Sequence, residues 1–389
     1  MNVHEPSNAA EHQEEPSGHV HRFSFLKKSW RMKFLGVCGL LCMAVPGLWQ
    51  SSIPSEPSEP YRFVAIADSR SGQFRSFHPT SAIDSQGMAM FRANLVEGGQ
   101  GIFMGNEAGQ ISIADTTGAF QLFRGTPALS QNGKVVFLSD AKSGAIGYFR
   151  GSNPDHDFVY GNPDFEDIGD VAINNQGMVA FKARLKSGRE KRRQVFIGNG
   201  GAAPKAVPES AHSHVGVPYL NDNGAVVFST GAQVFMSDGT VTISILKKDK
   251  EYFLFHRPVI NDAGVILVQA SLNTKDEGME KQLVLVEKGE RTVIASTEGP
   301  YAEFFSAHSL NNKGQIAFSA LLDSGIAGIF TGSDPATDTV IRQGDELAGS
   351  RILQGPVLSN HALNDEGVIV FFARLEDESE GIFLAKPRD

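Results

Sequence analysis

Residues 309–318 read Ser-Leu-Asn-Asn-Lys-Gly-Gln-Ile-Ala-Phe, and this stretch decides the fold because variants of it recur along the chain. A second close copy, Ala-Ile-Asn-Asn-Gln-Gly-Met-Val-Ala-Phe, occupies residues 172–181. With five weaker copies the motif occurs seven times, and successive copies lie between 40 and 53 residues apart. The glycines that the copies share are Gly87, Gly133, Gly177, Gly224, Gly264, Gly314 and Gly367. A repeat of this length is typical of β-propellers.

Each copy predicts a tight β-hairpin. An aliphatic residue is followed by Asn, Asp or Ser, whose side chain opens a type I turn. The glycine then takes the left-handed backbone conformation that closes a bulged loop without a Cβ clash. The residues after the glycine are apolar at consecutive positions, as in Ile316–Phe318. Such a run indicates a strand that is covered on both faces, as in stacked propeller blades.

The sixth repeat predicts four strands, at residues 304–310, 315–322, 328–332 and 339–343, and four strands make one propeller blade. The seventh repeat contains only three, because its third strand, residues 381–384, is close to residue 389. A strand without a repeat of its own, residues 61–66, precedes the first repeat. We therefore expect an all-β fold, a seven-bladed propeller of four-stranded blades in which residues 61–66 complete the last blade and close the ring.

The residues before the propeller predict a membrane-targeting segment. Residues 1–33 are polar and predict a disordered cytoplasmic tail that ends in a basic flank. Residues 34–50 are apolar, and residues 51–60 form a Ser/Pro linker to the propeller at 61–389. A basic flank before an apolar run predicts a transmembrane or signal helix with the flank in the cytoplasm and the following domain across the membrane.

Two interpretations of residues 34–50 remain open. An uncleaved anchor, bracketed by Trp30 and Trp49, would hold the propeller extracytoplasmic, in a periplasm or at the cell surface. A signal peptide cut near Ala44 or Gly47 would instead release the propeller as a secreted protein.

The repeat resembles the NxxGxxAF tandem-repeat proteins, which are exported bacterial proteins. Asn174–Phe181 and Asn311–Phe318 match the full motif, whereas Asp84 and Ser130 replace the asparagine in the first two copies and Val268 replaces the phenylalanine in the fifth. The resemblance covers residues 61–389 and implies a propeller-like fold and a surface location, with no activity. The hairpins are also similar to those of TolB-type periplasmic propellers, which implies binding of partners.

Composition excludes some classes of function. A net charge of −9 argues against nucleic-acid binding, which requires a basic face to neutralise phosphates. Cys38 and Cys42 both lie in the apolar segment, so the propeller has no disulfide and no thiolate chemistry. We find no catalytic, nucleotide-binding or calcium-loop motif, and expect no cofactor, no catalytic residue and no metal site.

A group of histidines predicts a ligand site in the channel. The first strand of a blade lines the channel, and His308 and His361 stand six residues before the repeat glycine in adjacent blades. His256, His212 and His214 lie slightly earlier in their blades, near the channel mouth. We interpret these five residues as a site for an anion, a metal or a polar ligand. The alternative is a set of separate, solvated or hydrogen-bonded histidines, because a histidine pair alone is not a metal site.

A basic loop predicts a second binding surface. Lys186, Arg189, Lys191, Arg192 and Arg193 form the one basic cluster in an acidic propeller. The cluster could dock on an anionic lipid surface, a polysaccharide or an acidic partner, or it could be a solvated hairpin loop.

The sequence favours a membrane-tethered, extracytoplasmic binding module without enzymatic activity. Its partner would be a protein, a polysaccharide or a small-molecule ligand, with the membrane contacted through residues 34–50. The alternative is a propeller hydrolase or lyase with a channel-mouth site, which requires carboxylates, or carboxylates with histidine, at one point of the channel. A structural protein of an envelope layer is a third hypothesis.

Overall fold

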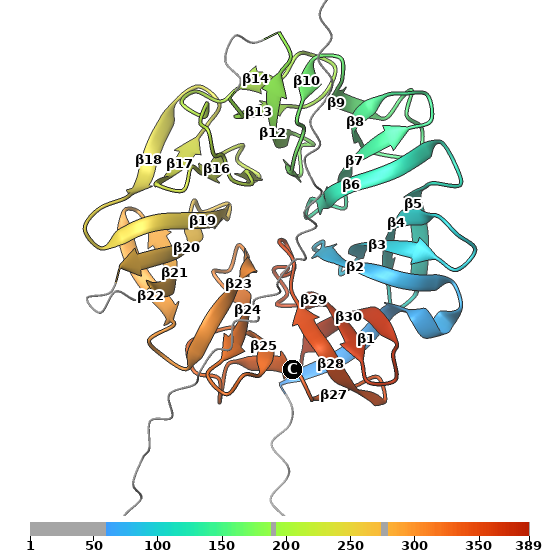
Figure 1. The fold of residues 1–389 in the computed structure, drawn as a ribbon, viewed down its shortest axis with the longest axis vertical. Coiled ribbons are helices and arrows are strands. Elements are labelled where there is room, and N and C mark those ends of the chain that lie inside the picture. Colours follow the sequence, from blue (N-terminus) through green and yellow to red (C-terminus); the bar gives the residue numbers. More distant parts are fainter. Residues whose placement is uncertain (1–59, 188–191, 274–278, 389) are drawn as a thin grey trace, which may run out of the picture. The chain divides into compact units, whose positions relative to one another are not determined.

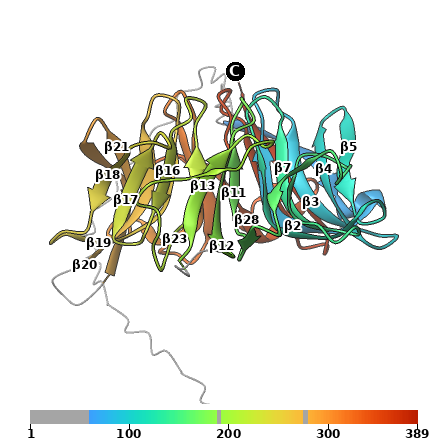
Figure 2. The ribbon, with the colours of Figure 1, turned by 90° about the horizontal axis from the view of Figure 1, so that it is seen from above.

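The computed structural model describes residues 60–187, 192–273 and 279–388. In these ranges, seven antiparallel sheets stand in a ring around a central channel (Figure 1), which confirms the seven-bladed propeller. Figure 2 shows the same ring from its edge, with the blades side by side. The predicted tail, the apolar segment at 34–50 and the linker up to residue 59 lie outside the described residues.

The strands follow the order of the repeats. Blade 1 contains β2 (Phe74–Ile83), β3 (Ala89–Leu95), β4 (Gln100–Asn106) and β5 (Gly109–Asp115). Blade 2 contains β6 (Phe120–Leu129), β7 (Val135–Ala141), β8 (Ile146–Phe149) and β9 (Phe158–Gly161). Blade 3 contains β10 (Phe165–Glu166), β11 (Val171–Ile173), β12 (Val179–Leu185), β13 (Gln194–Gly198) and β14 (Lys205–Ala206). Blade 4 contains β15 (Tyr219–Leu220), β16 (Val226–Ser229), β17 (Gln233–Ser237) and β18 (Thr242–Lys247).

The remaining three blades follow in the same order. Blade 5 contains β19 (Tyr252–Ile260), β20 (Ile266–Asn273), β21 (Met279–Glu287) and β22 (Glu290–Ser296). Blade 6 contains β23 (Tyr301–Leu310), β24 (Ile316–Leu322), β25 (Ala327–Phe330) and β26 (Thr339–Arg342), close to the four predicted ranges. Blade 7 contains β27 (Glu346–Leu347), β28 (Ser350–Val357), β29 (Ile369–Leu375) and β30 (Glu380–Pro387), and a short 3₁₀ turn, η1 (Ser69–Ser71), follows the N-terminal strand.

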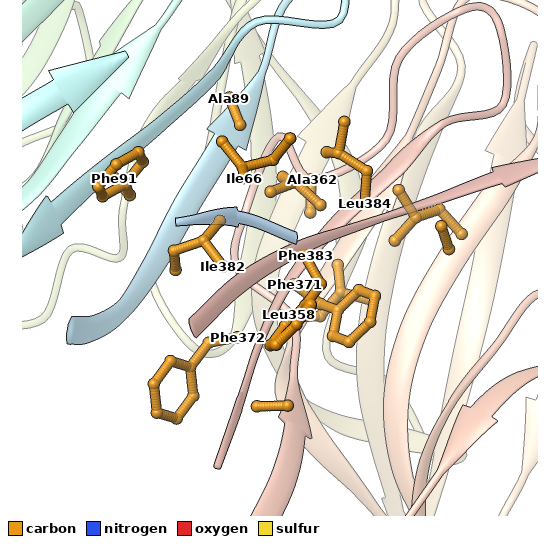
Figure 3. Close-up of a cluster of buried hydrophobic side chains, with 14 of the residues drawn as sticks. Ile66, Ala89, Phe91, Leu358, Ala362, Phe371, Phe372, Ile382, Phe383 and Leu384 are labelled. Atoms are coloured by element: carbon orange, nitrogen blue, oxygen red, sulfur yellow. The ribbon is translucent and has the colours of Figure 1, made fainter. Parts of the chain in front are cut away.

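The N-terminal strand β1 (Tyr61–Asp68) closes the ring as predicted. It pairs antiparallel with β30, from Tyr61 opposite Pro387 to Asp68 opposite Gly381, and so becomes the outer strand of blade 7. Figure 1 shows the blue β1 beside the red strands of that blade. Figure 3 shows the core at this seam, where Ile66 lies near Phe371 and Phe383. The two ends of the propeller therefore meet in one sheet, and burial of their apolar side chains holds the ring shut.

The repeat turns are confirmed. All seven repeat glycines have φ between 76° and 84°, in the left-handed region that glycine alone adopts without strain. In the third copy, the Asn174 Oδ1 accepts a hydrogen bond from the Met178 backbone N–H at 2.9 Å, which closes the turn.

The repeat asparagine also ties five of the seven blades to the next one around the ring. The Nδ2 of Asn174 in blade 3 donates to the Asn221 carbonyl at 3.1 Å, which is the same position in blade 4. Equivalent bonds of 2.8–3.1 Å continue from Asn221 to Asn261, Asn311, Asn364 and finally Asp84 in blade 1. We call this series the asparagine chain. It ends at Asp84 because a carboxylate has no amide hydrogen to donate.

Candidate functional site

The central channel contains a cavity of about 80 Å³, which we call the channel cavity. It is lined by residues that stand five to seven positions before the repeat glycines, as expected for the first strand of each blade. The polar side chains in its wall come from five blades, and they are Thr126, Asp170, Tyr219, Arg257, Asn360 and His361. The rest of the wall is apolar and includes Pro127, Val171 and Pro218.

Tyr219 and His361 face each other across the channel. Tyr219 begins β15 in blade 4, and His361 follows β28 in blade 7, which is not a neighbour of blade 4 in the ring (Figure 1). The centroids of their rings are 5.1 Å apart, with 32° between the ring planes. Both residues also line a second cavity of about 60 Å³ among the repeat turns. The pair therefore forms the boundary between the two cavities.

Several polar atoms along the first strands are buried without a hydrogen-bond partner among the described residues. They are the Tyr219 hydroxyl, the Asn360 Oδ1, the Thr80 Oγ1 and the Ser81 Oγ. An unpartnered buried polar group costs about 1–3 kcal/mol, and proteins retain few of them unless water or a ligand satisfies them. Two of them, the Tyr219 hydroxyl and the Asn360 Oδ1, belong to residues that line the channel cavity, where a polar ligand or ordered water can complete the hydrogen bonding.

Arg257 gives the channel cavity its uncompensated charge. It lies in a bulge of β19, where the pairing with β20 shifts between His256 and Val259, and its φ of 45° is left-handed. Bulges redirect side chains, here toward the cavity. In the part of the chain that the structure describes, no ion pair joins Arg257 to a carboxylate. Asp170 also lines the cavity, but its carboxylate is 2.8 Å from the Lys182 Nζ and is compensated by it.

Burial keeps the aromatic groups of the channel uncharged at neutral pH. It lowers the pKa of His361 to about 4, although the ring keeps some accessible surface because it faces both cavities. Burial also lowers the pKa of His308 to about 4, with the Arg257 charge acting in the same direction and the Arg257 and Leu267 backbone carbonyls opposing it. Desolvation raises the pKa of the Tyr219 hydroxyl far above its ordinary value.

Of the five predicted histidines, the structure brings His361 to the cavity and leaves the others away from it. His308, within β23, is 1 % exposed, and it lines neither the channel cavity nor the cavity among the repeat turns. His256 is exposed on β19, and His214 is exposed in the loop before β15. The backbone of His212 forms an isolated antiparallel β-bridge with that of Arg193. The His212 ring stacks on the Phe235 ring, with the ring centroids 6.0 Å apart.

The basic loop is only partly described, because Arg189 and Lys191 lie outside the described residues. Lys186 and Arg192 are exposed, but the Arg193 guanidinium makes two hydrogen bonds to the Asp167 carboxylate, at 2.6 and 2.7 Å. Part of the positive charge of the loop is therefore balanced within blade 3, and docking on an anionic partner stays a prediction.

Sequence reasoning missed Tyr219, Arg257 and Asn360. A signal for Tyr219 exists, since it is the one large side chain among the residues five positions before the repeat glycines. The other six residues at that position are Ala82, Ala128, Ala172, Val259, Ser309 and Ala362. Arg257 and Asn360 stand seven positions before Gly264 and Gly367, one residue before the position at which the histidines were counted, so that count passes over them.

The described residues contain no group of three or more His, Cys, Asp or Glu side chains that could hold a metal ion. None of their helices has the length and apolar character needed to cross a membrane.

Comparison with known proteins gives a partial family match. Residues 245–360, which is less than half of the chain, match a family described as "Family of unknown function (DUF7453)". No curated protein sequence matches the chain. The resemblance to the NxxGxxAF proteins stays a prediction.

The chain is similar to several solved structures. One is YCF48 bound to a D1 peptide, with 10 % identity, 87 % of this chain and 100 % of that chain covered, and a TM-score of 0.45. Another is U3-55K, with 12 % identity, 83 % of this chain and 98 % of that chain covered, and a TM-score of 0.47. A third is the GH74 xyloglucanase from Xanthomonas campestris, with 10 % identity, 83 % and 55 % covered, and a TM-score of 0.45. These similarities carry no information about activity.

Proposed function

We propose that the chain is a non-enzymatic binding module whose ligand occupies the channel cavity beside Tyr219 and His361. The observation that carries this proposal is the Tyr219 hydroxyl, which belongs to a residue only 2 % exposed and has no partner among the described residues. A buried phenol normally has its hydroxyl bonded. A ligand that accepts or donates a hydrogen bond at this point would remove the cost of leaving the hydroxyl unpaired.

The composition of the cavity wall supports binding. Ligand pockets are mostly apolar and contain a few convergent polar groups that fix orientation. Here the apolar wall includes Pro127 and Val171, and the polar groups of Tyr219, Arg257 and Asn360 reach the cavity from three different blades. A site that several blades share is available only when the ring is closed, so folding and ligand recognition are linked.

The chemistry of the cavity favours binding over turnover. A general base works best when its pKa is near the operating pH. The pKa of His361, about 4, makes its imidazole a weak base at neutral pH. Asp170 is engaged by Lys182 at 2.8 Å and is therefore not free to activate a nucleophile. These properties support the binding module over a hydrolase or lyase.

We also propose that residues 34–50 tether the propeller to a membrane, with the propeller extracytoplasmic. The support is the basic flank followed by an apolar run in the sequence. Mass spectrometry of the native N-terminus, with alkaline extraction of membranes, tests this proposal. An intact N-terminus in the extracted membrane fraction is expected, whereas a new N-terminus after residue 44 or 47 in the soluble fraction would show secretion.

The binding proposal is tested by the small molecules that co-purify with the full chain. The wild-type protein, purified in mild detergent, is expected to release a stoichiometric small molecule on denaturation, detected by mass spectrometry. The double variant Tyr219→Phe with Asn360→Leu removes the two oxygens that have no partner, together with the Asn360 Nδ2. It should fold normally and carry no ligand.

The matched control is Tyr148→Phe. Tyr148 is also fully buried, but its hydroxyl donates to the Gly169 carbonyl at 2.7 Å, away from the channel cavity. This variant should lose stability and keep the ligand. Equal ligand content in wild type and double variant, or no ligand in either, would contradict the channel site.

A further inference from the structure

We infer that the channel cavity binds a small aliphatic carboxylate, with its head group on Arg257 and its hydrocarbon tail against the apolar wall. This inference rests on the proposed function and specifies the chemical class of the ligand. It is carried by three properties of the cavity, which are its charge, its hydrogen-bonding groups and its size.

The charge of the cavity selects an anion. Arg257 lines the cavity and has no carboxylate partner among the described residues, whereas Asp170 is compensated by Lys182. His361 adds no charge at neutral pH because burial holds its pKa at about 4. A charge without a partner in a partly buried site is unfavourable, and an incoming anion relieves that cost.

The hydrogen-bonding groups suit a carboxylate. The guanidinium of arginine is a planar fork of N–H donors that binds both oxygens of a carboxylate. The Tyr219 hydroxyl, buried and without a partner, supplies a further donor at the same cavity. The Asn360 side chain adds an amide whose Nδ2 can donate to a carboxylate oxygen, whereas its Oδ1 can only accept. The oxygens of one carboxylate can accept from the guanidinium and the phenol together.

The size and the wall of the cavity limit the rest of the ligand. One water molecule needs roughly 10–15 Å³ of cavity volume. The channel cavity of about 80 Å³ therefore holds about five to eight groups of the size of a water molecule, and propionate is about that large. Pro127, Val171 and Pro218 present apolar surface. A short hydrocarbon tail gains from contact with this wall, whereas an inorganic phosphate would press hydrated oxygens against it.

Calorimetric titration of the full chain in detergent micelles at pH 7 tests the inference. Propionate is the probe, and propionamide, with the same shape and no charge, is its comparison. Propionate is expected to bind at least tenfold more tightly than propionamide. Arg257→Gln should weaken propionate binding at least tenfold. Arg257→Lys keeps the charge but not the planar fork, so its affinity for propionate should lie between those of the wild type and Arg257→Gln.

The control variant is Arg351→Gln, which removes an exposed arginine from β28, outside the channel cavity. Its affinity for propionate should equal that of the wild type. Thermal unfolding of each variant checks folding. If Arg257→Gln fails to fold, Arg257→Lys still tests the inference, because it must bind propionate more weakly than the wild type does.

The outcomes separate the ligand class from the site. Equal affinities for propionate and propionamide would overturn the inference that the ligand is a carboxylate, and so would an unchanged affinity for propionate in a folded Arg257→Gln variant. The proposed binding site in the channel cavity would still stand if a small molecule co-purifies with the wild type. A short peptide with a free C-terminal carboxylate is a further probe. If it binds more tightly than propionate, and amidation of its C-terminus abolishes the binding, the ligand is the end of a peptide chain and the inference of a small free carboxylate is wrong. Absence of both probe binding and co-purified ligand would overturn the proposed function as well.

Discussion

The phenol ring of Tyr219 contacts the imidazole of His361 across the channel, with the ring centroids 5.1 Å apart. The contact joins blades 4 and 7, which are not adjacent, so it connects opposite sides of the ring. The backbone of His361 has a left-handed φ of 59°, and its carbonyl accepts a hydrogen bond from the Ile83 N–H of blade 1 at 3.0 Å. Left-handed backbone is unfavourable for a residue with a Cβ. The surrounding blades therefore hold the imidazole in place at the cavity.

Replacement of Tyr219 by phenylalanine should leave the propeller at least as stable as the wild type. The ring contact with His361 is kept, and the lost hydroxyl has no partner among the described residues. We expect the free energy of unfolding in the absence of ligand to stay equal or to rise by up to about 1 kcal/mol. Urea unfolding, followed by fluorescence, measures the change. A loss of more than about 1 kcal/mol would mean that the hydroxyl makes a bond in the folded state.

The buried His308 should make stability depend on pH. Its pKa is about 4 in the folded protein and about 6.5 in an unfolded chain, so the unfolded state binds the proton more readily between these values. The free energy of unfolding therefore falls as pH decreases from about 6.5 to about 4. His308→Gln removes this contribution, which we expect to be about 2–3 kcal/mol between pH 7 and pH 4.5. Urea unfolding of both proteins at the two pH values checks the difference, and parallel losses in the two proteins would refute the assignment.

Asp84→Asn should stabilise the propeller by extending the asparagine chain. The Asp84 Oδ1 already accepts from the Met88 N–H at 2.8 Å, which an asparagine Oδ1 would keep. The new Nδ2 would point to the next blade, as the Nδ2 of Asn364 does toward the Asp84 carbonyl at 3.0 Å. Burial raises the pKa of Asp84, which shows that its charge is disfavoured there. We expect a gain of about 1 kcal/mol in denaturant unfolding at pH 7.

The reverse change, Asn221→Asp, is the paired control. It removes the Nδ2 that donates to the Asn261 carbonyl at 3.0 Å and keeps the turn acceptor for the Ala225 N–H. A loss of about 1–2 kcal/mol is expected. If Asp84→Asn and Asn221→Asp change stability in the same direction, the asparagine chain does not link the blades in the way described.

The seam between β1 and β30 can be locked by a disulfide. Arg62 and Lys386 are direct partners in this pairing, and both side chains are solvent-accessible and bind Glu107, so their loss costs little. In a chain with Cys38 and Cys42 changed to alanine, Arg62→Cys with Lys386→Cys should oxidise. The cross-link should then stabilise the propeller by about 2–4 kcal/mol. Thermal unfolding with and without reductant measures this, with Arg62→Cys alone as control. Failure to oxidise under conditions that keep the protein folded would place β1 elsewhere.

The repeat architecture was predictable from the sequence because its signals are local. The spacing of Gly87 to Gly367 gave the seven blades, and the position of residues 61–66 gave the closing strand. The asparagine chain was not predicted, because the donor of Asn174 and its acceptor at Asn221 meet only when the blades are arranged in the ring.

The candidate site was less predictable because strand bulges break the register. We assumed that residues before the repeat glycine continue along the channel wall. In β19 the pairing shifts between His256 and Val259, so His256 is exposed while the neighbouring Arg257 lines the cavity. A similar shift in β23 lies between Phe304 and His308. The hydrophobic pattern alone does not locate such shifts.

A crystal structure of the full chain soaked with propionate at neutral pH tests the central claim most directly. The account predicts electron density for the carboxylate within hydrogen-bond distance of the Arg257 guanidinium and the Tyr219 hydroxyl, with the tail toward Pro127 and Val171. A channel cavity that contains only ordered water at saturating propionate, with the Arg257 guanidinium turned away from it, would contradict the account.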